Sequence, residues 1–159
     1  MSVLTTEYAY RNEDGQLHRE DGPAVQHPNG DKAWWLNGKL HRENGPAVEL
    51  ADGDKVWYLN GQLHRENGPA IERADVTKDE WWLNGKRHRE DGHAVELDNG
   101  TKVWMLNGQI HREDGPAVEY ANGGKAWWLK DKLIAALTNL DLMHEHQRPR
   151  TIEDILNNE

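Results

Sequence analysis

Residues 34–49 read WWLNGKLHRENGPAVE, and this stretch decides the fold because each part of it favours a strand or a turn. The two tryptophans and the leucine are typical of a β-strand, and Asn37-Gly38 is a two-residue turn signal that tolerates positive φ. The chain after this turn is expected to return antiparallel, until Gly45-Pro46 breaks the strand direction. The stretch therefore predicts a β-meander unit with no helix in it.

The same unit recurs along the chain. The triplet His-Arg-Glu appears five times, beginning at His18, His41, His64, His88 and His111, so the period is about 23 residues. Such a period is typical of stacked repeats, in which each unit buries its apolar face on its neighbours. We therefore predict an all-β repeat fold, an elongated antiparallel sheet of stacked β-hairpins, over residues 1–129. Its units start near Tyr8, Trp34, Trp57, Trp81 and Trp104, with a partial unit at Trp127.

Positions that stay constant between repeats indicate the scaffold. Tryptophan recurs at 34, 57, 81, 104 and 127 and leucine two residues later, so period two places both columns on one face, which we expect to be the core. An alanine that recurs in the next strand indicates a close approach there. The large residues between the first two columns point the other way and form either a second buried layer or an exposed, adhesive candidate binding surface. These are Trp35, Tyr58, Trp82, Met105 and Trp128.

Residues 130–159 carry a different pattern. Asp131 is expected to cap a helix whose apolar residues are spaced by three and four, namely Leu133, Ile134, Leu137 and Leu140. Thr151, followed by Asp154, resembles the start of a second short helix. We predict a short C-terminal α-helical tail, which either caps the last strand or binds a partner or a second copy.

The charge of −9 and the absence of cysteine limit the function. A protein that wraps nucleic acid needs a basic stripe, so that class is not expected, whereas a basic protein partner is compatible with the charge. Without cysteine there are no disulfides, thiolate nucleophiles or cysteine zinc sites. No stretch approaches the ~18 apolar residues of a transmembrane segment, and the expected location is cytoplasmic.

The repeated histidines and arginines are candidate site residues. Equivalent histidines in successive units lie about 10 Å apart, too far to share a metal ion, so each is expected to hydrogen-bond its own loop and no metal site is predicted. The arginines form a column that either pairs with the following carboxylates to brace the loops or grips the phosphate of a ligand stacked on tryptophan. This column comprises Arg42, Arg65, Arg89 and Arg112, preceded by Arg19.

Catalysis is not expected, because an active site is normally a unique constellation and the reactive residues here recur five times. Glycine-rich phosphate loops, nucleophile elbows and paired-histidine helix motifs are missing from the sequence. We predict no catalytic residue and no cofactor.

From Trp35 to His41, then at Gly45 and Asp52-Gly53, the unit resembles the MORN repeat, whose pattern is an aromatic, Asn-Gly-Lys-x-His, Gly and Asp-Gly. The His-Arg-Glu-Asp-Gly-Pro-Ala variant is similar to repeats in uncharacterised bacteriophage, large-virus and bacterial proteins. The resemblance implies stacked MORN-like β-hairpins that serve as a scaffold or binding surface. The longer His-Arg-Glu link departs from ordinary MORN units, so their lipid and junction roles are not carried over.

These observations favour a non-enzymatic protein-binding or scaffold module. The resemblance suggests a phage-encoded factor that binds and inhibits or redirects a host protein in the host cytoplasm. The alternative is sequestration of a small nucleotide-type ligand by the tryptophan and arginine surface. Open strand edges also make a homo-oligomer an expected arrangement.

Overall fold

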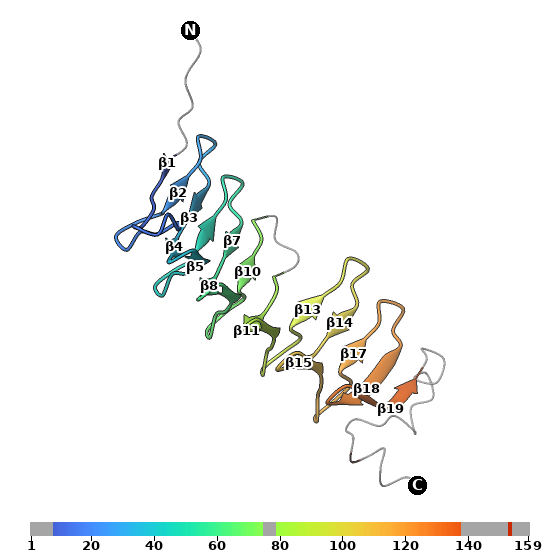
Figure 1. The fold of residues 1–159 in the computed structure, drawn as a ribbon. Coiled ribbons are helices and arrows are strands. Elements are labelled where there is room, and N and C mark those ends of the chain that lie inside the picture. Colours follow the sequence, from blue (N-terminus) through green and yellow to red (C-terminus); the bar gives the residue numbers. More distant parts are fainter. Residues whose placement is uncertain (1–7, 75–78, 138–152, 154–159) are drawn as a thin grey trace. The chain divides into compact units, whose positions relative to one another are not determined.

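The structure of the chain is a computed structural model, and it describes residues 8–74, 79–137 and 153. The chain divides into two compact units, Met1–Gly85 and Lys86–Glu159. In both units, the described residues up to Leu137 form short antiparallel strands joined in hairpins (Figure 1). The all-β hairpin architecture predicted from the sequence is confirmed.

The first unit contains one larger sheet and two small hairpins within its described residues. The sheet has the order β1-β2-β3-β6-β7-β10, with bounds Tyr8–Ala9, Val25–Gln26, Lys32–Ala33, Val48–Glu49, Lys55–Val56 and Ile71–Glu72. The hairpins pair β4 (Trp35–Leu36) with β5 (Lys39–Leu40) and β8 (Tyr58–Leu59) with β9 (Gln62–Leu63). The strand β11 (Trp82–Leu83) also lies in this unit.

The second unit repeats this plan. Its sheet has the order β13-β14-β17-β18-β19, with bounds Val95–Glu96, Lys102–Val103, Val118–Glu119, Lys125–Leu129 and Lys132–Leu137. A small hairpin pairs β15 (Met105–Leu106) with β16 (Gln109–Ile110), and β12 (Lys86–Arg87) precedes the sheet.

The tryptophan at the start of a repeat closes a five-residue loop, as Trp34 does. The backbone N–H of Trp34 donates to the Ala47 carbonyl at 2.8 Å, and the Trp34 carbonyl accepts the backbone N–H of His41 at 3.0 Å. Both partners flank Arg42–Pro46, so one residue holds the base of this loop. Trp57 and Trp104 make the same pair of bonds. We call the five segments Arg19–Pro23, Arg42–Pro46, Arg65–Pro69, Arg89–His93 and Arg112–Pro116 the arginine loops.

The recurring alanine, rather than the recurring tryptophan, is the most buried position. Ala24, Ala47, Ala70, Ala94 and Ala117 are all 0% exposed. The indoles of the Trp34 column are half-buried, except for Trp127, which is 1% exposed. A methyl group fits between adjacent strands, whereas covering a whole indole takes more neighbouring side chains. The expectation that the Trp34 column forms the core is therefore only partly met.

The predicted helix after Asp131 is wrong where the structure describes it. Leu133, Ile134 and Leu137 lie in β19, which pairs with β18. Lys130 and Asp131 have φ of 49° and 65° and occupy the place of the Asn-Gly turn in the other repeats. The Asp131 carboxylate accepts the Ile110 N–H at 2.8 Å, so this aspartate fixes a hairpin turn and does not cap a helix. Leu140 and the second predicted helix lie outside the described residues, apart from Glu153.

Enlarging a buried alanine is expected to destabilise the second unit. Ala117→Leu forces extra methylenes into a site with 0% exposure and should lower the free energy of unfolding by about 1–3 kcal/mol. Urea denaturation measures this change. The control is Ala136→Leu, at an exposed position of β19, which should change stability by no more than about 0.5 kcal/mol. Equal effects of the two substitutions would contradict the assignment of the alanine column as the core.

Candidate functional site

Each arginine loop is organised by its own arginine. The Arg42 guanidinium carbon lies 3.8 Å from the centroid of the Trp34 ring, and Arg65 lies at the same distance from Trp57. Arg112 stacks on Trp104 at 4.4 Å. In each loop, Nη1 also donates to the backbone carbonyl four residues on, at 3.0 Å for Arg42. The arginine therefore joins the loop to the indole below it through a cation–π contact and a charge-assisted hydrogen bond.

In each arginine loop the guanidinium lies close over the glycine, so a larger residue there would have to displace it. A Cβ built on Gly115 would lie 2.9 Å from the Arg112 guanidinium carbon, and one on Gly92 would lie 2.8 Å from that of Arg89. The backbone of both glycines avoids positive φ, so the close approach alone explains the residue. The sequence had suggested only a chain-breaking role for these glycines.

The carboxylate that pairs with each arginine depends on the third loop residue. Where that residue is aspartate, the arginine Nε donates to it, at 2.7 Å from Arg19 to Asp21 and at 2.8 Å from Arg112 to Asp114. In the loop that begins at Arg42, the third residue is Asn44. The Arg42 Nη1 donates instead to Glu49 at 2.9 Å. Carboxylates thus engage the guanidinium groups in both kinds of loop, which agrees with the predicted bracing ladder.

The same pairing shifts the ionisation of the aspartates. The hydrogen bond donated by Arg112 holds the pKa of Asp114 below its ordinary value, and Arg89 lowers the pKa of Asp91 in the same way. Arg19 lowers the pKa of Asp21. These aspartates stay ionised and remain matched to their arginines at neutral pH.

The recurring histidines hydrogen-bond the next repeat, whereas the sequence-based expectation was a hydrogen bond to their own loop. Toward their own loop they make only a longer contact with its glutamate, at 3.9 Å for His41. His41 Nδ1 accepts the backbone N–H of Asn60 at 3.2 Å, and His18 Nδ1 accepts that of Asn37 at 3.1 Å. The same Nδ1 atoms also lie within hydrogen-bond distance of the asparagine side chains, at 3.0 Å from Asn60 Oδ1 and 2.9 Å from Asn37 Oδ1. Asn37 and Asn60 open the Asn-Gly turns, with φ of 49° and 53°. Each histidine therefore supports the turn of the following repeat, a contact that spacing within one repeat does not reveal.

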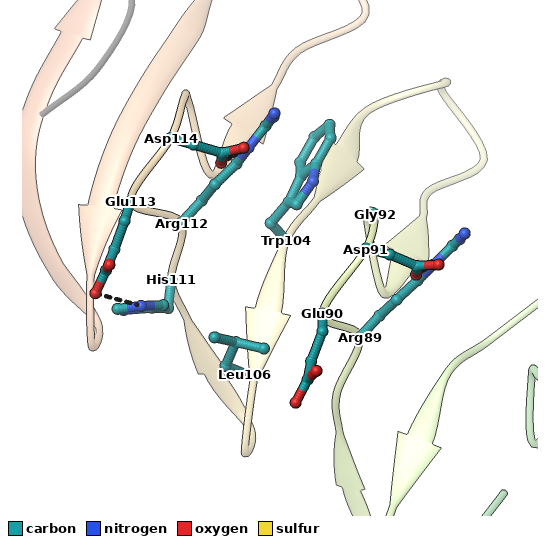
Figure 2. Close-up of a pocket in the computed structure, with 10 residues that line it drawn as sticks. All are labelled: Arg89, Glu90, Asp91, Gly92, Trp104, Leu106, His111, Arg112, Glu113 and Asp114. Carbon is teal, nitrogen blue, oxygen red and sulfur yellow. Dashed lines mark hydrogen bonds and ion pairs between the residues drawn. The ribbon is translucent and has the colours of Figure 1, made fainter. Parts of the chain in front are cut away.

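Adjacent arginine loops enclose clefts with an apolar floor. In the second unit, a cleft of about 480 Å³ lies between the loops that begin at Arg89 and Arg112, and Trp104 and Leu106 line its floor. Figure 2 shows the Trp104 ring and Leu106 between the two loops. The first unit has an equivalent cleft of about 460 Å³ over Trp34 and Leu36. The same residue types at the same repeat positions thus build a cleft in each unit.

The Trp104 ring is held from two sides. Arg112 stacks on it, and His93, which replaces the proline of the other loops, packs edge-on with ring centroids 5.5 Å apart. Burial lowers the pKa of His93, which favours its neutral form. The cleft floor is therefore a fixed aromatic surface.

The rims of both clefts carry glutamates that extend into solvent. The side chains of Glu43 and Glu113 are 75% and 82% exposed. Each lies near the Nε2 of its own histidine, at 3.9 Å for His41 and 3.6 Å for His111. Because the cleft arginines are engaged by other carboxylates, these glutamates leave each rim with a net negative charge.

The predicted binding column lies beside the clefts and contributes its backbone to the stacking. The carbonyls of Tyr58 and Trp82 accept the N–H groups of Arg42 and Arg65, both at 3.1 Å. All five members of that column are half-buried; they are Trp35, Tyr58, Trp82, Met105 and Trp128. The clefts are lined by the tryptophan and leucine columns that were expected to form the core, and by the glutamates that follow the arginines. Of the predicted arginine column, Arg42, Arg89 and Arg112 line the clefts. The loop glutamate recurs in all five copies, and this recurrence was the signal that could have revealed the acidic rim of the clefts.

The described residues also bear on metal binding and on membrane spanning. Within the described ranges, His, Asp and Glu side chains form no group of three able to hold a metal ion. Over those same ranges, the structure has no helix with the length and apolar character needed to cross a bilayer.

The chain matches no protein-family model and no curated protein. The geometry of the clefts is therefore the basis for inferring a function.

A double-mutant cycle tests the packing of the arginine against glycine. Gly115→Ala should lower stability by about 1 kcal/mol, because its Cβ displaces the Arg112 guanidinium from its contacts. In the Arg112→Ala background the same substitution should cost about 1 kcal/mol less. Denaturant unfolding of the four proteins measures the coupling. Strictly additive effects would show that the two residues do not interact.

The loop aspartates predict an acid-dependent loss of stability. Their folded-state pKa values lie below the unfolded ones, so their contribution is complete above about pH 4 and is lost as pH falls through the folded values. We expect the stability advantage of the natural chain over Asp91→Asn/Asp114→Asn to shrink in that acid range. Urea unfolding at a series of pH values measures it, and a difference that stays constant down to acid pH would refute the pairing.

Proposed function

We propose that this chain is a non-enzymatic protein-binding module whose binding surface is formed by the clefts between successive arginine loops. The observation that carries the proposal is the recurrence, in both units, of a cleft with a tryptophan–leucine floor and an acidic rim. Apolar floors with polar rims are typical of protein interaction surfaces, and aromatic residues dominate their binding energy. A surface repeated along an array suits an extended protein segment better than a single small substrate.

The charge distribution disfavours the nucleotide alternative. The guanidinium groups of Arg42 and Arg112 already donate to carboxylates and backbone carbonyls. A phosphate entering a cleft would have to displace these partners and approach Glu43 or Glu113. The Nε1 atoms of Trp35 and Trp128 are shielded from solvent and lack a hydrogen-bond partner among the described residues, so these indoles are not open stacking platforms.

The resemblance described above supports a place for the chain among MORN-like repeat proteins with the His-Arg-Glu-Asp-Gly variant. On that basis we propose a phage-encoded factor that binds and inhibits or redirects a host protein in the cytoplasm. The acidic charge of −9 favours rapid association with a basic partner. A homo-oligomer through strand edges remains part of the proposal.

Affinity purification of the tagged chain, with mass spectrometry of both the protein and the small-molecule fractions, tests the function. Leu36→Gln/Leu106→Gln makes both cleft floors polar and should reduce recovery of the partner about tenfold. Cross-links from the bound partner should map to the arginine loops.

The matched control is Leu50→Gln/Leu97→Gln, which changes two exposed leucines at 37% and 44% exposure in the turns of the larger sheets. It should leave recovery unchanged, and thermal unfolding should show that both double variants fold. If only a small molecule copurifies with the natural chain, the protein-binding proposal fails.

A further inference from the structure

The shape and charge of the clefts select a side chain of a particular kind. The floor at Trp34 and Leu36 is apolar, whereas the rim presents Glu20 and Glu43, which are 83% and 75% exposed. Lysine and arginine match both features, because their aliphatic stems pack on apolar surface while their charged ends remain at the rim. The second unit offers the same combination, with Trp104 and Leu106 below and Glu113 at the rim.

The cations already present in the loops do not fill this role. Arg42 is stacked on Trp34 and hydrogen-bonded to Glu49 and the Pro46 carbonyl. Arg112 is held in the same manner by Trp104, Asp114 and Pro116. Among the described residues, each rim glutamate has one side-chain contact, with the Nε2 of its own histidine at 3.6–3.9 Å, and no arginine or lysine pairs with it. The unmatched charge is therefore negative and lies at the cleft mouths.

The stacking of the repeats sets the spacing of the side chains that could enter. Within the first unit, each repeat adds two strands to the sheet, so successive arginine loops are about 10 Å apart at ~4.8 Å per strand. A polyproline II segment rises ~3.1 Å per residue with three residues per turn, so every third side chain points the same way after about 9 Å. The loop beginning at Arg65 continues the pattern, since Arg65 stacks on Trp57 and is followed by Glu66.

We propose that the partner presents an extended, basic segment with lysine or arginine at every third position, and that each cationic side chain enters one cleft between adjacent arginine loops. This inference deepens the proposed function and rests on it. Glu43 and Glu113 are the specificity-determining residues, because they stand at the mouths of the clefts and receive the charged ends. Trp34 and Trp104 receive the aliphatic stems.

Fluorescence anisotropy with a synthetic peptide tests the proposal on the full chain. The probe has about fifteen residues, built from a repeated Lys-Pro-Ala triplet that favours the extended helix. A second peptide of identical composition has its lysines clustered at one end. The spaced peptide should bind about tenfold more tightly than the clustered one at physiological salt, and its affinity should fall as salt is raised. Equal affinities would show unspecific charge attraction and overturn the proposal.

Two charge-matched double variants locate the binding. Glu43→Gln/Glu113→Gln removes one rim charge from the cleft of each unit and should weaken the spaced peptide about tenfold. Asp52→Asn/Asp98→Asn removes the same charge from exposed turns of the larger sheets and should change the affinity less than twofold, on the order of experimental error. Equal weakening by both variants would overturn the cleft assignment.

The outcome also separates this inference from the proposed function. If the purified chain retains a protein partner and Glu43→Gln/Glu113→Gln does not weaken its binding, the basic-segment inference fails while protein binding stands. If neither a partner nor the spaced peptide binds, both fail.

Discussion

The packing of one guanidinium against one indole determines most of what this molecule presents to solvent. Arg42 on Trp34 and Arg112 on Trp104 join a five-residue loop to the indole beside it, and the guanidinium lies so close to the loop glycine that a side chain there would displace it. The tryptophan backbone holds the base of the same loop. Few large side chains are fully buried among the described residues of either unit, so such local closure takes the place of a deep core.

The same interaction decides the charge of the surface. Each arginine is matched by a carboxylate within its own repeat, either the loop aspartate or the glutamate of the following strand. The glutamate next to the arginine remains unmatched at the mouth of each cleft. In the triplet His-Arg-Glu, the histidine therefore contacts the next repeat, the arginine braces its own loop and the glutamate places a charge in solvent. A repeat that uses its cations internally exposes an acidic, apolar-floored surface, and this is why a protein segment suits it better than a phosphate ligand.

Several features could be predicted because they are local. The Asn-Gly turns, the antiparallel pairing and the arginine–carboxylate ladder follow from residue types a few positions apart. The features that sequence reasoning missed depend on the neighbouring repeat. His41 was expected to bond its own loop and instead supports the turn at Asn60, and the residues after Asp131 were expected to be helical, although β18 provides a strand edge on which they pair. Apolar residues spaced by three and four satisfy a helix pattern, but pairing with an adjacent strand overrides this local preference.

The sequence by itself determined the period, the hairpin turns and the acidic character of this protein. Each follows from residue types and their spacing along the chain, without knowledge of which residues meet in space. Only the tertiary structure decided which columns face each other. It showed that alanine is the buried position, that the Trp35 column lies beside the clefts, and that Trp34, Leu36 and Glu43 meet around a cleft. The physical reason is that period two in a strand separates two faces but does not say which face a neighbouring loop will cover. That choice depends on the path of the arginine loop, which the guanidinium stacked on the indole fixes in three dimensions.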